Sequence, residues 1–81
     1  MEAMRQRIVQ AYKNHEFLKI IFNYPSANRA TIKRGLIIEV FYEGFTMEDI
    51  IDGKVTFSYK YISEIKVEEI VLLGSKSESA K

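Results

Sequence analysis

The chain has 81 residues, 47% of them hydrophobic and 28% charged, which is the composition of one ordinary folded domain. It has no cysteine and one histidine, which excludes a disulfide framework and a thiolate zinc site and leaves little for a nucleophile–base pair. Residues 1–34 carry seven bases and two acids, whereas residues 35–73 carry three bases and eight acids. This uneven charge distribution favours binding of a polyanion on one side of the protein, or head-to-tail contact with another copy. The alternative is that both sets of charges are scattered over a solvated surface.

The first predicted element is a helix over about residues 2–14. Met4, Ile8 and Tyr12 recur every four residues, the spacing of one apolar helix face. Asn14 is the expected stop, because asparagine tolerates the left-handed conformation at a helix end. The N-terminal stretch lacks the apolar core of a signal peptide, and no run approaches the length of a membrane span. Together with the absence of cysteine, this predicts a cytoplasmic protein without membrane association.

From residue 17 the apolar period changes to two, which is typical of strands. We expect five strands, at about residues 17–24, 30–41, 45–50, 54–60 and 64–72, with a 3₁₀ turn over residues 61–63. Leu36, Ile38 and Val40 form the expected inner row of the second strand. Residues 1–74 make a single domain, and residues 75–81 are expected to be a flexible tail because they are polar.

Two turns marked by glycine join the middle strands, and burial predicts their register. If Val40 faces Phe45, the first loop is residues 41–44, with Gly44 at positive φ. At the second turn, a three-residue loop of residues 51–53 pairs Met47 with Phe57, and its glycine is left-handed. A two-residue loop would instead place these apolar residues opposite polar ones, so we expect the longer loop.

Five short, strongly bent strands leave fewer exposed edges if they close on themselves. The sequence therefore predicts a mainly β fold, in which an N-terminal α-helix caps a five-stranded antiparallel SH3/Sm-like small barrel. The main alternative is an open five-stranded sheet with the helix on one face.

Several stretches resemble known families. Gly35 in "KRGLIIEVF", the hairpin "EGFTMED" and Tyr59-Lys60-Tyr61 in "FSYKYISEI" are similar to the Hfq-like branch of the Sm-like family, which has histidine where Tyr61 stands. "IVQAYKNHEFLKIIFNY" and "VTFSYKYISEI" resemble the WYL domain of bacterial regulators, although the Trp-Tyr-Leu signature is absent and Tyr61 replaces an expected arginine. Both resemblances imply a prokaryotic small barrel; the first implies RNA binding by a ring of subunits, and the second implies ligand recognition within a regulator.

A basic cluster is the leading candidate site. Arg29, Lys33 and Arg34 lie in the loop before the second strand and at its start. Simple strand alternation would point Arg34 inward, on the same side as the expected inner row of the second strand. Either a bulge at Gly35 shifts the alternation, or Arg34 lies at a barrel rim. The alternative is a solvent-facing arginine on a bent strand. A rim arginine beside an aromatic ring can hold a phosphate while the ring stacks a base. The Hfq-like resemblance adds Lys60 and Tyr61 to this site.

Ile37 and Phe41 share the outer parity of the second strand, so they are expected to form an apolar surface that the helix or a second copy covers. Glu48, Asp49 and Asp52 lack the spacing of a calcium loop and are expected to form a solvated acidic rim. We therefore expect a non-enzymatic binding module with no metal and no cofactor. Its expected partner is single-stranded RNA or a small anionic, nucleotide-like ligand, bound weakly; the alternative is a protein-interaction or homo-oligomeric self-assembly module.

Overall fold

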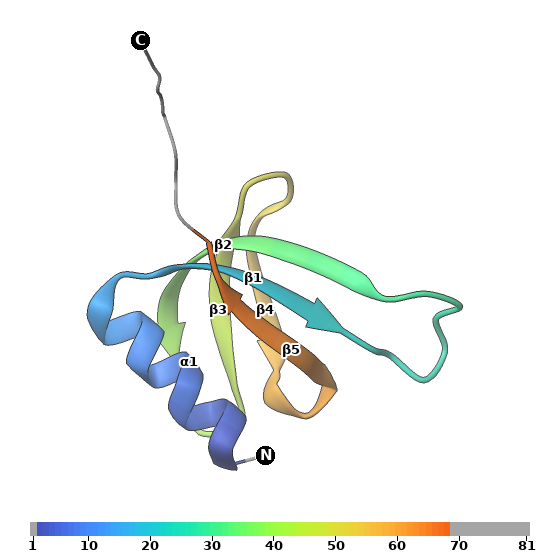
Figure 1. Ribbon diagram of the computed structural model, residues 1–81, viewed down its shortest axis with the longest axis horizontal. Helices are drawn as coiled ribbons and strands as arrows, with labels where there is room; N and C mark the ends of the chain where they lie inside the picture. Colours follow the sequence, from blue (N-terminus) through green and yellow to red (C-terminus); the bar gives the residue numbers. More distant parts are fainter. Residues whose placement is uncertain (1, 69–81) are drawn as a thin grey trace, which may run out of the picture.

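The computed structural model describes residues 2–68, so the predicted flexible tail and the end of the fifth predicted strand lie outside the described residues. In chain order the elements are α1 (Glu2–Asn14), β1 (Phe17–Phe22), β2 (Thr31–Val40), β3 (Gly44–Asp49), β4 (Gly53–Ser58), the 3₁₀ helix η1 (Tyr59–Tyr61) and β5 (Ile62–Val67). The strands make one bent antiparallel sheet in the order β4-β3-β2-β1-β5, with α1 beside it (Figure 1). The predicted helix and five antiparallel strands are confirmed.

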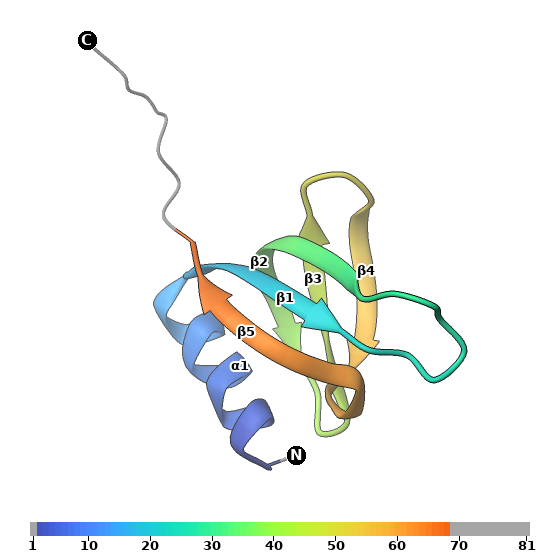
Figure 2. The same ribbon diagram turned by 45° about the vertical axis from the view of Figure 1, so that its right-hand side comes forward.

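The two edges of the sheet are β4 and β5, which are joined in sequence by η1. Within residues 2–68 no strand pairing links one edge to the other, so the sheet is not closed and the barrel part of the prediction is not confirmed. Figure 2 shows the curvature that carries β1 and β5 across the front of β3 and β4.

Helix α1 packs through one apolar face, on which Ile8 and Ala11 are buried. At its C-terminal end the Glu16 N–H donates to the Ala11 carbonyl (3.0 Å) and the His15 N–H to the Tyr12 carbonyl (3.4 Å), the bonding of a Schellman cap. The helix ends at Asn14 as predicted, but the left-handed conformation expected at Asn14 is held by the next residue, His15 (φ 55°). Neither α1 nor η1, the two helices of the described chain, has the length and apolar character needed to cross a bilayer.

The core lies on the concave side of the sheet, as the period of two predicts. The inner residues of β1 are all fully buried: Leu18, Ile20 and Phe22. Aromatic rings fill the centre, with the Phe22 and Phe57 centroids 4.6 Å apart and those of Phe45 and Tyr59 5.5 Å apart. Such ring pairs contribute more than their buried area alone.

The predicted inner row of β2 is right for Val40 and wrong for Leu36. Gly35 and Ile37 are the inward residues, Leu36 is exposed, and a register shift between Ile37 and Glu39 restores the phase so that Val40 faces Phe45. The bulge therefore lies at Ile38 and not at Gly35. Ile37 is only 6% exposed, so it belongs to the core and not to an outer interface.

Gly35 explains why the apolar pattern of the sequence did not predict the inward residues of β2. A Cβ at this position would lie 1.8 Å from the Glu48 carbonyl oxygen, so the inward position must be empty of a side chain. A glycine contributes no apolar signal to the period, which left Leu36 as the apparent inner residue.

The first turn is confirmed in its register, because Val40 pairs with Phe45. The expected positive φ at Gly44 is wrong: Gly44 begins β3, and Gly53 is the glycine with positive φ among the described residues. The absence of a side chain at Gly44 serves close packing instead, since a Cβ there would lie 2.2 Å from the Phe57 carbonyl oxygen.

The second turn is a three-residue loop, as predicted, but it lies one residue earlier. Asp49 pairs with Gly53 and Phe45 with Phe57, so the predicted pairing of Met47 with Phe57 is shifted by two residues. A shift of two preserves which face each side chain takes, and Phe45, Met47 and Phe57 are all buried. Gly53 is left-handed (φ 76°) as expected, and η1 begins two residues before the predicted 3₁₀ turn.

Candidate functional site

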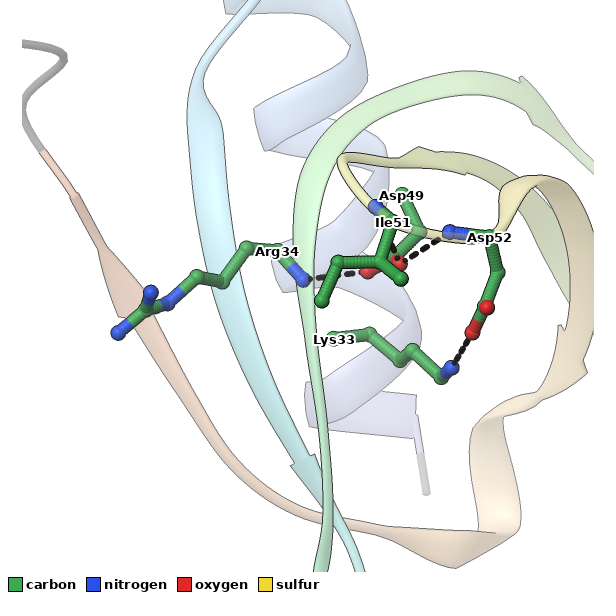
Figure 3. A network of polar contacts seen from close by, with 5 residues as sticks. All are labelled: Lys33, Arg34, Asp49, Ile51 and Asp52. Carbon is green, nitrogen blue, oxygen red and sulfur yellow. Dashed lines mark hydrogen bonds and ion pairs between the residues drawn. The ribbon is translucent and has the colours of Figure 1, made fainter.

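The three residues of the predicted basic cluster do not lie together in the structure. Lys33 forms an ion pair with Asp52, at the tip of the β3–β4 hairpin. Arg34 points to the opposite face and extends across β1 (Figure 3). Its Nε lies 3.5 Å from Glu68 Oε1. Arg29 is exposed in the loop between β1 and β2. Arg34 is thus a solvent-facing residue on a bent strand, and the three cations do not form one site.

Asp49 organises the hairpin tip instead of lying on a solvated rim. It is only 5% exposed, and its carboxylate accepts hydrogen bonds from the backbone N–H groups of Arg34 (2.9 Å), Ile51 (3.0 Å) and Asp52 (2.9 Å). Burial by itself would raise the pKa of Asp49, but the three N–H donors and the nearby Lys33 together hold that pKa below its ordinary value. The expected solvated role of Asp49 is therefore wrong. Strand alternation does place Glu48 on the opposite, exposed side, as predicted.

Lys60 and Tyr61 lie at the other end of the hairpin, beside Tyr24. The Tyr24 and Tyr61 ring centroids are 5.0 Å apart, and Lys60 Nζ lies 5.1 Å from the Tyr61 centroid. Burial raises the pKa of Tyr24, while the charge of Lys33 opposes that rise more weakly. Lys33 therefore has an electrostatic link to Tyr24.

A groove of about 370 Å³ opens where three segments meet: the first turns of α1, the β2–β3 turn and the junction of β4 with η1. All three lie at the same end of the molecule in both views (Figures 1 and 2). The groove is lined by Glu2, Arg5, Tyr42, Glu43, Ser58, Tyr59 and Lys60. Of these, sequence reasoning had named Lys60 as a candidate.

Arg5 and Tyr42 are the chemically distinctive pair in the groove. The Arg5 guanidinium carbon lies 5.5 Å from the centroid of the Tyr42 ring, and Tyr42 is 80% exposed. Arg5 Nη1 lies 3.4 Å from Glu2 Oε2, a long ion pair. Arg5 Nε is buried and finds no hydrogen-bond partner among residues 2–68. An unmade hydrogen bond at a buried donor costs about 1–3 kcal/mol.

A hydrogen bond joins two of the segments that form the groove. The Tyr59 hydroxyl donates to the Phe41 carbonyl (2.8 Å), which ties η1 to the β2–β3 turn below Tyr42. Burial raises the pKa of Tyr59, and the positive charge of Arg5 opposes that rise. The arrangement offers two cations and an exposed ring beside the carboxylates of Glu2 and Glu43. The cations and the ring together suit a small anion that carries an aromatic group.

No protein-family model, no curated protein and no solved structure matches this chain. The function of the groove is consequently inferred from its geometry and charge.

Proposed function

We propose that this chain is a non-enzymatic module that binds single-stranded RNA, or a nucleotide-like anion, weakly in the groove between α1 and η1. The observation that carries the proposal is the Arg5–Tyr42 pair, in which a guanidinium whose Nε has no hydrogen-bond partner among residues 2–68 lies over an exposed aromatic ring. A phosphate bound by arginine next to a ring that stacks a base is a common way to hold a single strand.

In this scheme Arg5 contacts a phosphate, Lys60 supplies a second positive charge from η1, and Tyr42 stacks the adjacent base. Glu2 and Glu43 also line the groove and repel a polyanion, which supports weak binding of short ligands over tight binding of long duplexes. Stacking on one ring contributes about 1–3 kcal/mol per base, so Tyr42 is the main source of affinity.

The same proposal includes the Sm-like small-barrel assignment and a cytoplasmic location. The assignment is supported by the helix followed by five strands, by the bend of the sheet and by the short η1 link between the two edge strands. The location is supported by the cysteine-free composition.

Fluorescence anisotropy with labelled oligouridine and oligoadenosine at two salt concentrations tests RNA binding. We expect Arg5→Gln to weaken binding and to reduce the slope of log affinity against log salt by about 0.7, the value for one phosphate on a single strand. Tyr42→Ser should weaken binding about 5- to 150-fold with little change in that slope. Arg7→Gln is the matched control, because Arg7 lies on the same helix but pairs with Glu16 outside the groove. Equal effects of the Arg5 and Arg7 variants would rule out the groove.

Self-assembly is the second candidate, and it is favoured by the sides of β4 and β5 that no other strand of residues 2–68 pairs with. Each edge strand offers backbone N–H and C=O groups to another chain, and Phe41 is exposed near the β4 end. Sedimentation of the native chain and of Phe41→Ser distinguishes the two candidates. A larger mass that falls in the Phe41 variant supports self-assembly through this residue, whereas a single-chain mass in both excludes it. Tyr42→Ser serves as the control, because it should affect RNA binding and leave the mass unchanged.

A further inference from the structure

The outer face of the sheet carries an apolar surface that the described residues leave uncovered. Ile32 and Leu36 of β2 point outward on either side of Arg34, and Ile50 and Ile51 extend this surface from the β3–β4 turn. We call these four residues the outer apolar patch. Ile51 is 85% exposed, and a hollow of about 280 Å³ lies between Ile32, Arg34, Asp49 and the two turn isoleucines.

The patch is held in a fixed shape, which distinguishes it from isolated exposed side chains. The Asp49 carboxylate binds the N–H groups of Ile51 and Asp52, and the Ile50 N–H donates to the Arg34 carbonyl (2.9 Å). A preformed apolar surface loses little conformational entropy when it is covered, so it is suited to docking.

The charges on the β1 side of the patch indicate what covers it there, whereas on its β3 side Leu36 pairs with the acidic Glu48. Lys19 pairs in register with Arg34 on one side and with Lys66 on the other, so three cations lie in one row across β2, β1 and β5. A partner that combines acidic residues with apolar ones would match this combination of cations and apolar residues.

Such a sequence follows β5 directly in the same chain. Glu68 and Glu69 precede the apolar run Ile70-Val71-Leu72-Leu73. Glu68 already forms the ion pair with Arg34, and its N–H donates to the Phe17 carbonyl (2.9 Å). Because Phe17 pairs with Leu36, Glu68 lies about two strand spacings, or roughly 10 Å, from the patch. Five extended residues span about 17 Å, so residues 69–73 reach across it.

We propose that the run Ile70-Val71-Leu72-Leu73 docks on the outer apolar patch of its own chain, with Glu68 and Glu69 beside Lys19 and Arg34. The proposal gives Arg34 a role, which is to hold the start of the run against the sheet. It is independent of the groove, because the β2–β3 turn and the β4–η1 junction that line the groove lie at the opposite end of the β3–β4 hairpin from the patch. Figure 1 shows these segments at the two ends of the hairpin.

The absence of native cysteine allows a direct test by disulfide trapping in the full chain. Ile51→Cys/Leu72→Cys places one thiol in the patch and one in the run. Tyr42→Cys/Leu72→Cys is the matched control, since Tyr42 is exposed to nearly the same extent (80% against 85%) but lies in the groove. In glutathione buffers we expect the first pair to form an intrachain disulfide with an effective concentration at least about tenfold above that of the control pair.

Equal effective concentrations for the two pairs would overturn the proposal. Covalent dimers of the first pair would also overturn it, because they would identify a second copy as the occupant. A second measurement uses a variant in which the patch residues are unchanged, Leu72→Ser/Leu73→Ser. In this variant the methyl NMR signals of Ile50 and Ile51 should shift relative to the native chain, and those of Val9 on α1 should not. Unchanged Ile51 signals would contradict docking.

Discussion

Replacing Asp49 with asparagine tests whether one buried carboxylate fixes the β3–β4 turn. In the native protein this carboxylate accepts three backbone N–H groups, one through Oδ1 and two through Oδ2. Asparagine keeps one acceptor oxygen of the same size and replaces the other with an NH₂ group. That group points at an N–H donor whichever way the amide turns, so at least one hydrogen bond is lost.

The magnitude follows from those contacts. A hydrogen bond to a charged group contributes about 1.5–3 kcal/mol, and a buried donor left without a partner costs a similar amount. We expect Asp49→Asn to lower the free energy of unfolding by about 2–4 kcal/mol. An 81-residue domain has roughly 4–12 kcal/mol in total, so the loss is a large fraction of its stability.

The pH dependence gives an independent check. The folded pKa of Asp49 lies below its ordinary value, so the unfolded chain binds the proton more readily than the folded one. The stabilisation is complete above about pH 4, the unfolded pKa, and is lost as the pH falls through the folded pKa. The difference between native protein and Asp49→Asn should therefore be constant near neutral pH and narrow in acid.

Urea unfolding at pH 7 and at several values below pH 4 measures both effects. Glu48→Gln is the matched control, because Glu48 is the exposed neighbour on β3 and its replacement should change stability by less than about 0.5 kcal/mol. The reasoning is refuted if Asp49→Asn costs no more than Glu48→Gln, or if the gap between native protein and Asp49→Asn does not narrow in acid.

Three further predictions concern the scaffold, and chemical unfolding measures each. Gly35→Ala should lower the free energy of unfolding by at least about 3 kcal/mol, since the new Cβ would meet the Glu48 backbone oxygen at 1.8 Å. A loss below about 1 kcal/mol would contradict this, because it would mean that β2 moves away from β3 easily. His15→Gly should stabilise the chain by up to about 1 kcal/mol by removing the left-handed strain at the end of α1, and a loss of stability would contradict that account. Tyr59→Phe should cost about 1 kcal/mol by deleting the bond to the Phe41 carbonyl. Because burial raises the pKa of Tyr59, the native chain should also lose stability above about pH 10, and this alkaline loss should be smaller in Tyr59→Phe.

The sequence predicted the fold well wherever large apolar residues occupy the inner positions. In β1, β3 and β4 the alternating Leu, Ile, Phe and Met side chains are the buried ones, so period and burial agree. In β2 the inner position is Gly35 and the phase changes at Ile38, so the apolar pattern indicated the wrong face. Close backbone packing determines which face of β2 points inward, and hydrophobic periodicity does not detect such packing.

The site was harder to predict because its parts are far apart in the chain. Lys33 and Arg34 are neighbours on a strand and must point to opposite faces, a signal that was present in the sequence and argued against a shared site. The pair of Arg5 with Tyr42 has no local signature, since it arises when α1 packs beside the β2–β3 turn. Asp49 carried a weaker signal, a strand-end aspartate just before a turn, where its carboxylate can bind the next N–H groups.

The strand order also affects the sequence in which the strands pair during folding. Three of the four pairings, β1–β2, β2–β3 and β3–β4, join neighbours in sequence, whereas β5 returns to pair with β1. That last pairing brings Leu18 beside Val67 and closes a loop through most of the chain, so its entropic cost is the highest and it forms late. During synthesis on the ribosome, a four-stranded intermediate would present the apolar β1 as a bare edge until residue 67 emerged. That intermediate is the species most exposed to aggregation.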